Sequence, residues 1–98
     1  MPSGARSAPG PLTQELAAIL RERRGRLRVS QALIASDAHM STSQLSAFLN
    51  GQKHIDIEQF EAICVSLGLN YIEVLKQAED ATTRRHVDRR RASKGEEK

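Results

Sequence analysis

The 98-residue sequence predicts an all-α fold, a compact domain of five short helices. Three observations support this prediction. Aromatic residues make up only 3% of the chain, and its other apolar residues are mainly Ala, Leu and Ile, which suit closely packed helices. Apolar residues recur at helical spacing in five segments that are bounded by capping residues or glycines. No segment shows the apolar–polar alternation of a half-buried strand.

The first helix follows a polar N-terminal segment. Residues 1–10 are rich in Pro, Gly and Ser, and we interpret them as a flexible arm. Pro11 suits the first turn of a helix. An apolar stripe at positions i, i+4, i+7 and i+8 then consists of Leu12, Leu16, Ile19 and Leu20. This stripe predicts a helix that buries its apolar side chains, runs to about Arg24 and ends at Gly25.

The second and third helices are short, and each begins at a predicted cap. Ser30 is the expected N-cap of the second helix. Ser41 and Gln44 have the spacing of a capping box at the start of the third helix, which ends at Asn50-Gly51. The core residues predicted for these two helices are Ile34, Ala35, Ala38, Leu45, Phe48 and Leu49. A turn of about four residues separates the helices.

The last two helices repeat this pattern. Asp56 with Gln59, and Asn70 with Glu73, have capping-box spacing. The fourth helix is expected to end at Gly68. Its predicted core residues are Ile57, Phe60, Ile63, Cys64 and Leu67. In the fifth helix, Leu69 and Val74 occupy the positions of a hydrophobic staple, and Ile72 and Leu75 are expected to face inward.

The apolar periodicity ends near residue 80, which defines three parts of the chain. We predict an arm over residues 1–10, a helical domain over residues 11–80 and a basic polar tail over residues 81–98. Val87 is the only large apolar residue of the tail. The tail can therefore extend the fifth helix but cannot pack one by itself.

Composition argues against several classes of protein. Cys64 is the only cysteine, so neither an internal disulfide nor a thiolate metal cluster is expected. The three histidines are scattered, and no catalytic or phosphate-binding motif occurs, so we expect no enzyme activity, cofactor or small-molecule ligand. No apolar run approaches the length of a membrane span, and no signal-peptide core is present. A cytoplasmic protein is predicted.

Charge is segregated along the chain. Residues 21–28 contain five arginines and one acidic residue, and residues 84–98 contain seven basic residues and three acidic ones. Between them, residues 29–83 contain two lysines and seven acidic residues. This distribution is typical of a surface that faces a polyanion, although solvated helix faces would give the same counts.

Residues 29–51 carry the functional signal. They predict a short helix, a tight turn and a second helix that close against each other. Such a pair can place its first helix across a phosphate backbone and its second helix in the major groove of DNA. The second helix then needs small polar side chains on its outer face, and Thr42, Ser43, Ser46 and Ala47 meet this requirement.

This stretch resembles the DNA-binding domain of lambda-type phage repressors and the wider Cro/repressor (XRE) family of helix-turn-helix proteins. The resemblance covers about residues 11–77. The segments that match the family are Pro11-Leu-Thr-Gln-Glu15, Ser30-Gln31, Ile34-Ala35, Met40-Ser41, Phe48-Leu-Asn-Gly51, Gly68-Leu-Asn70 and Ile72-Glu-Val-Leu75. It implies a compact five-helix fold and a transcriptional regulator, a phage repressor or Cro-like protein, that inserts the helix of about residues 41–50 into operator DNA.

The sequence departs from the family pattern in four places. His39 stands in the turn where the family usually has Gly, a position that favours positive φ. Leu49 replaces a Glu that many relatives pair with an Arg of the first helix. The loop at residues 25–28 is about two residues longer than in the shortest members, and the arm carries a single basic residue, Arg6.

The resemblance also implies roles for individual residues. Gln31 and Asn50 are expected to bind phosphates, and Thr42 and Ser43 to read base edges. Ala47 is expected to meet a thymine methyl group, and Lys53 a base or the backbone. With the arginines that we expect to bind phosphates, the candidate DNA-binding residues are Arg26, Arg28, Gln31, Ser41, Thr42, Ser43, Gln44, Ser46, Ala47, Asn50 and Lys53.

The expected partners are operator DNA and a second copy of the chain. One recognition helix reads only a few base pairs, so a homodimer on inverted half-sites about 34 Å apart is predicted. The fifth helix is the expected dimer surface, through Tyr71, Val74 and Ala78. An antitoxin or helical protein-interaction module on the same fold is the alternative function, since fold alone does not decide it.

Overall fold

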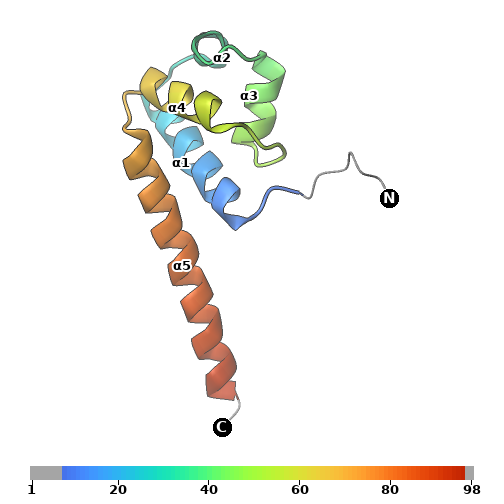
Figure 1. The fold of residues 1–98 in the computed structure, drawn as a ribbon, viewed down its shortest axis with the longest axis vertical. Coiled ribbons are helices and arrows are strands. Elements are labelled where there is room, and N and C mark those ends of the chain that lie inside the picture. Colours follow the sequence, from blue (N-terminus) through green and yellow to red (C-terminus); the bar gives the residue numbers. More distant parts are fainter. Residues whose placement is uncertain (1–7, 97–98) are drawn as a thin grey trace, which may run out of the picture.

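The computed structural model describes the backbone of residues 8–96 and the side chains of residues 8–84, so most of the predicted arm lies outside the described residues. Within residues 8–96 there is no strand, and the helices are α1 (Pro11–Leu27), α2 (Gln31–Asp37), α3 (Thr42–Leu49), α4 (Ile57–Ser66) and α5 (Tyr71–Glu96). Figure 1 shows α1 to α4 gathered in a globule, from which α5 continues as a long single helix. The predicted all-α fold is confirmed.

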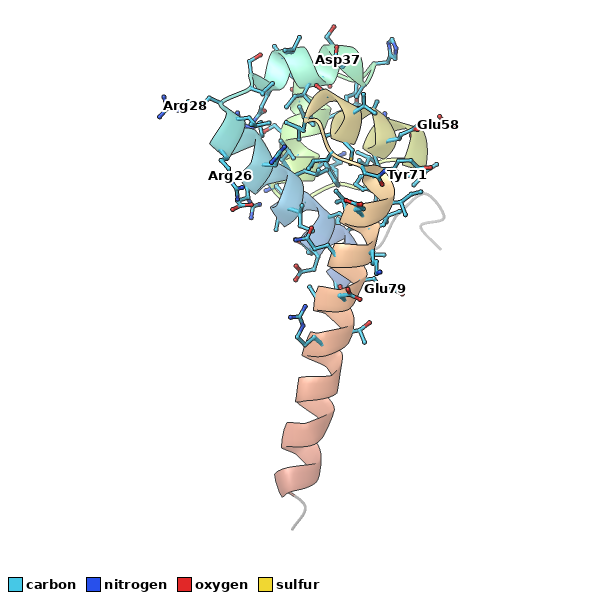
Figure 2. All side chains as sticks on the ribbon, turned by 90° about the vertical axis from the view of Figure 1, so that its left-hand side faces the viewer. Arg26, Arg28, Asp37, Glu58, Tyr71 and Glu79 are labelled. Atoms are coloured by element: carbon cyan, nitrogen blue, oxygen red, sulfur yellow. The ribbon has the colours of Figure 1, made fainter. Side chains whose placement is uncertain are left out.

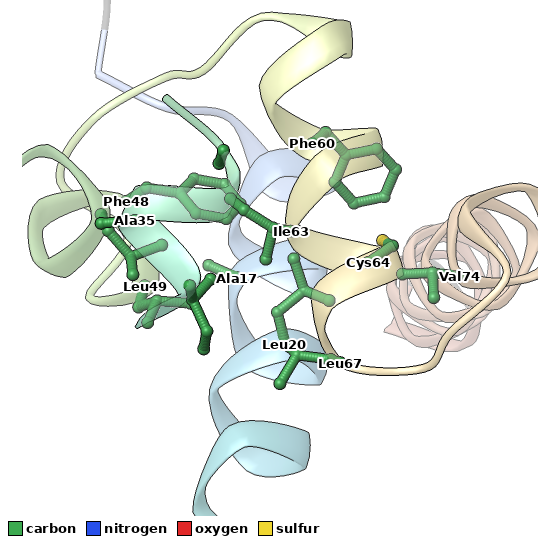
Figure 3. Close-up of a cluster of buried hydrophobic side chains, with 13 residues drawn as sticks. Ala17, Leu20, Ala35, Phe48, Leu49, Phe60, Ile63, Cys64, Leu67 and Val74 are labelled. Atoms are coloured by element: carbon green, nitrogen blue, oxygen red, sulfur yellow. The ribbon is translucent and has the colours of Figure 1, made fainter. Parts of the chain in front are cut away.

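All five helices contribute to one apolar core. The largest fully buried side chains are Phe48, Leu20, Ile34, Leu45, Ile63, Leu67 and Cys64. Figure 3 shows the side chains of α1, α3 and α4 converging, with Val74 reaching the cluster from α5. Burying one Leu, Ile or Phe side chain contributes roughly 1.5–3 kcal/mol, so this cluster is the main source of stability. Among residues 8–84, no polar or charged residue is buried in it.

The predicted caps are present. The Ser30 hydroxyl accepts a hydrogen bond from the backbone N–H of Leu33 at 3.1 Å. Complete capping boxes join Ser41 to Gln44 and Asp56 to Gln59. The Asn70 side chain accepts from the backbone N–H groups of Ile72 and Glu73 at 2.9 and 3.1 Å. These bonds satisfy backbone donors that the first turn of a helix otherwise leaves unpaired.

The first helix is longer than predicted. It passes through Gly25 and ends at Leu27, and Arg28 adopts the left-handed conformation with φ 59°. The backbone N–H groups of Arg28 and Val29 both donate to the Arg24 carbonyl, at 2.8 and 3.3 Å. A glycine inside a helix costs only about 1 kcal/mol, which the closing turn and the packing of α1 outweigh.

Several side chains lie on faces other than those predicted. Leu12, Ile57 and Ile72 were expected in the core but are exposed, and each lies in the first turn of its helix. Ile72 precedes buried Val74 by two residues and so points to the opposite face of α5. Val74 and Ala78 are themselves buried, which overturns their assignment to an exposed dimer surface.

Candidate nucleic-acid interface

The turn between α2 and α3 sets how these two helices meet. His39 adopts φ 55°, so it takes the positive value that a Gly in this turn would adopt without strain. The backbone N–H groups of His39 and Met40 donate to the carbonyls of Ser36 and Ala35 at 3.2 and 3.0 Å. These bonds close the end of α2 and direct the chain into the next cap. Figure 1 shows α2 and α3 beside each other at the end of the globule that is distant from the C-terminus.

The two faces of α3 differ completely. Leu45, Phe48 and Leu49 are buried, at 0%, 1% and 2% exposure. On the other face Thr42, Ser43, Gln44 and Asn50 are exposed, and Ser46 and Ala47 are half-buried. Residues 43, 46, 47 and 50 follow the i, i+3, i+4, i+7 spacing of one helix face. The outer face therefore carries no charge, and apart from Gln44 and Asn50 its side chains are small, which suits a helix that enters the major groove of DNA.

Two of the predicted site residues form the start of α3. The Ser41 hydroxyl accepts from the backbone N–H of Gln44 at 3.0 Å, and the Gln44 side-chain carbonyl accepts from the backbone N–H of Ser41 at 3.0 Å. The box fixes the direction of the first turn and so the orientation of Thr42 and Ser43. The Gln44 carbonyl thus already accepts one hydrogen bond within the protein, while its side chain stays exposed.

The remaining predicted residues surround α3. Gln31 is half-buried at the first position of α2, where unpaired backbone N–H groups favour an anion. Asn50 and Lys53 are exposed in the segment that follows α3. Figure 2 shows Arg26 and Arg28 pointing away from the protein at the end of α1. Arg26 forms an ion pair with Glu22, with an N–O distance of 2.7 Å.

Two residues of α1 hold the C-terminal end of α3, which the sequence did not predict. An Arg21 guanidinium nitrogen donates to the Leu49 carbonyl at 2.7 Å, and the Gln14 amide nitrogen donates to the Gly51 carbonyl at 2.8 Å. The Leu49 side chain offers no carboxylate for an ion pair with Arg21, but its backbone carbonyl still binds this arginine of the first helix. Gln14 and Arg21 are two turns apart on one face of α1. This spacing is too common in helices to predict from the sequence that both side chains bind the end of α3.

Two further arginines of α1, Arg23 and Arg24, also bind backbone oxygens. Arg23 donates to the Leu67 carbonyl at the end of α4, at 3.4 Å. Arg24 donates to the Val29 carbonyl at 3.0 Å, while its Nε is buried without a hydrogen-bond partner. Helix C-termini carry partial negative charge, so cations there are stabilising. Much of the positive charge in residues 21–28 is therefore engaged within the protein.

The described residues offer little for catalysis or metal binding. Burial raises the pKa of the Cys64 thiol to about 12, and the nearby Glu61 carboxylate adds to this shift. A thiol with this pKa is protonated at neutral pH and is a poor nucleophile. No group of three or more His, Cys, Asp or Glu side chains that could bind a metal ion occurs within the described residues. Nor is any helix there both long and apolar enough to cross a membrane.

Comparisons with known proteins agree with this geometry. A family model described as a helix-turn-helix domain matches residues 15–75, which include α2, the turn and α3. Among solved structures, the crystal structure of the clp gene regulator ClgR from Corynebacterium glutamicum is similar, with a TM-score of 0.69 and 25% sequence identity. The similarity covers 87% of this chain and 90% of that chain. No curated protein matches the chain significantly.

Proposed function

Because this chain belongs to the helix-turn-helix domain family, we propose that it is a sequence-specific, DNA-binding transcriptional regulator of the repressor or Cro type. The observation that carries this proposal is the division of α3 into a packed inner face and an uncharged outer face of small polar side chains. Regulation of a gene is also what the name of the similar ClgR structure describes.

In the proposed complex, α3 lies in the major groove. Thr42 and Ser43 contact base edges from its first turn, and Ala47 contacts a thymine methyl group in the next turn. Hydroxyl groups can donate to purine N7 or accept from an exocyclic amine. The capping box orients these contacts, because it fixes where the helix begins.

The remaining candidate residues position the protein on the phosphates. Gln31 and Asn50 bind the backbone on either side of the inserted helix, and Arg26, Arg28 and Lys53 add positive charge. Contacts of this kind hold the domain on any sequence and weaken with salt. A homodimer then places two α3 helices on inverted half-sites, which lengthens the sequence that is read.

The proposal is tested by selecting bound duplexes from a random pool and measuring affinity for the enriched site. We expect Thr42→Ala and Ser43→Ala to lose about 1–3 kcal/mol of discrimination at one or two positions, because each removes a base contact. Thr83→Ala, a change of the same size at an exposed position of α5, is the matched control. Melting temperatures of all three should stay near that of the wild type. Failure to enrich any sequence would reject the proposal.

A further inference from the structure

The C-terminal end of α3 is closed by its own backbone and is also bound by α1. The backbone N–H groups of residues 50–52 donate to carbonyls within α3, at 3.0, 2.9 and 2.8 Å, and so end the helix. The carbonyls of Leu49 and Gly51 accept instead from α1, through Arg21 at 2.7 Å and Gln14 at 2.8 Å. The two helices are therefore joined at the end of α3 by two side chains that bind backbone oxygens.

Asn50 stands between these two bound carbonyls. It is the C-cap of α3, with φ −90° and ψ 6°, and its side chain is exposed. The carbonyl of the residue before it and the carbonyl of the residue after it are both held by α1. A rotation of the backbone at Asn50 would lengthen one of these bonds. The direction in which Asn50 leaves α3 is therefore set from α1.

Gln14 makes more than one contact at this point. Its amide nitrogen also donates to the Pro9 carbonyl at 3.4 Å, so one carboxamide joins the segment before α1 to the turn after α3. Gly51 has φ 76°, which favours glycine, and a Cβ at this position would overlap the Gln14 side-chain oxygen. The absence of a side chain at Gly51 leaves the space that the Gln14 carboxamide occupies.

We propose that Gln14 is a positioning residue for DNA binding, which holds the end of α3 so that Asn50 meets a phosphate. The inference rests on the proposed function, in which Asn50 binds the DNA backbone, and it assigns to Gln14 no contact with DNA. Gln14 is exposed, whereas the core lies on the other side of α1 around Ala17 and Leu20. Its substitution should therefore misplace Asn50 without unfolding the domain.

The first experiment measures affinity for a duplex that carries one copy of the enriched half-site, so that pairing of two copies does not contribute. We expect Gln14→Met, which keeps the length of the side chain and removes its donor, to weaken binding about threefold to tenfold. Gln77→Met is the matched control, because it makes the same change at an exposed position of α5. Wild-type affinity of Gln14→Met, or an equal loss in Gln77→Met, would overturn the inference.

A double-mutant cycle distinguishes positioning of Asn50 from a direct contact of Gln14 with DNA. In an Asn50→Ala background, Gln14→Met should have little further effect on affinity, because the contact that it positions is already absent. In a Thr42→Ala background it should keep its full effect, since the capping box orients Thr42 at the other end of α3. A full effect in both backgrounds would contradict positioning through Asn50.

Hydrogen exchange of the free protein supplies a readout that needs no DNA. The backbone amides of residues 50–52 should exchange at least about threefold faster in Gln14→Met, because the turn that they close opens more often. Unchanged exchange at these amides would overturn the inference. If the wild type binds its half-site but the cycle is additive, the inference is wrong and the proposed function stands. If no duplex is enriched from the random pool, the proposed function fails, and the assignment of Gln14 to DNA binding fails with it.

Discussion

The five arginines of residues 21–28 differ in what they contact. Three of them bind carbonyl oxygens of the protein backbone, and two do not. Arg21 and Arg23 donate to carbonyl oxygens at the ends of α3 and α4, and Arg24 donates to the Val29 carbonyl in the link that follows α1. Arg26 and Arg28 make no such bond among the described residues, and Arg26 pairs only with Glu22. We call Arg21, Arg23 and Arg24 the internal group, because they bind the protein backbone, and Arg26 and Arg28 the external group.

The difference shows that a local count of positive charge overestimates what is available to DNA. A guanidinium that stabilises a helix C-terminus is held by that contact and contributes to folding. A guanidinium at the exposed end of α1 contributes little to folding and can bind a phosphate. Each group should therefore respond differently to substitution, in stability for the first and in salt dependence of binding for the second.

The largest effect is expected for Arg21→Met. The change removes the bond to the Leu49 carbonyl while preserving much of the aliphatic length, and we expect it to lower the free energy of unfolding by about 1–2 kcal/mol. Urea denaturation measures the loss. Arg21→Lys should recover part of it, and neither change should alter the slope of log affinity against log salt. A flatter slope for Arg21→Met would assign Arg21 to the external group.

Arg28→Gly is expected to have the next largest effect, with opposite sign. Arg28 has φ 59°, which costs a side-chain-bearing residue about 1 kcal/mol relative to glycine. The variant should therefore unfold at higher urea, while Arg28→Ala, which keeps the strain, should not. Both variants should reduce the salt slope by about 0.9 if Arg28 binds one phosphate. Unchanged slopes in both would remove Arg28 from the proposed interface.

The comparison also shows what the sequence could predict about the fold. Helix number, caps and most of the core followed from local patterns, because a capping box or an apolar stripe requires only neighbouring residues. The end of α1 did not follow, because Gly25 resembles a terminator although Arg28 takes the left-handed conformation. Leu12, Ile57 and Ile72 were assigned to the core because periodicity defines a helix face but not how far its neighbours extend.

The candidate site was predictable to a similar degree. The exposed outer face of α3 follows from the helix-turn-helix pattern within residues 29–51, whereas the positive φ of His39 could not be read from a residue type that tolerates it less well than glycine. The bonds from Gln14 and Arg21 to the end of α3 join residues that are 37 and 28 positions apart in the chain, and their acceptors are backbone carbonyls. Every residue has such a carbonyl, so residue types alone cannot identify these contacts.

Arg24→Met is expected to have a smaller effect than Arg21→Met, although both residues bind a carbonyl. The substitution loses the bond to Val29 but also removes the buried Nε that has no partner. The two contributions are each about 1 kcal/mol and oppose each other, so the net change in unfolding free energy should be within about 0.5 kcal/mol. Urea denaturation beside Arg21→Met measures this. A loss as large as that of Arg21→Met would indicate that water hydrates the Arg24 Nε.

The Glu22–Arg26 pair should likewise contribute little to stability, and its substitution gives the most direct information on the arginines that lie free of the protein backbone. The pair is exposed and spaced i, i+4, so Glu22→Ala and Arg26→Ala should each cost only about 0.3–0.5 kcal/mol of folding stability. Their effects on DNA should have opposite signs, because one removes an anion and the other a cation near the same phosphates. Arg26→Ala should weaken binding to all duplexes alike, and Glu22→Ala should strengthen it, most clearly at low salt where screening is weak. Titration of a non-specific duplex at two salt concentrations measures both affinities.

Two other outcomes would contradict this expectation. If both variants bind more weakly than the wild type, the intact ion pair positions Arg26 for the DNA. If both bind as tightly as the wild type, this end of α1 lies away from the DNA.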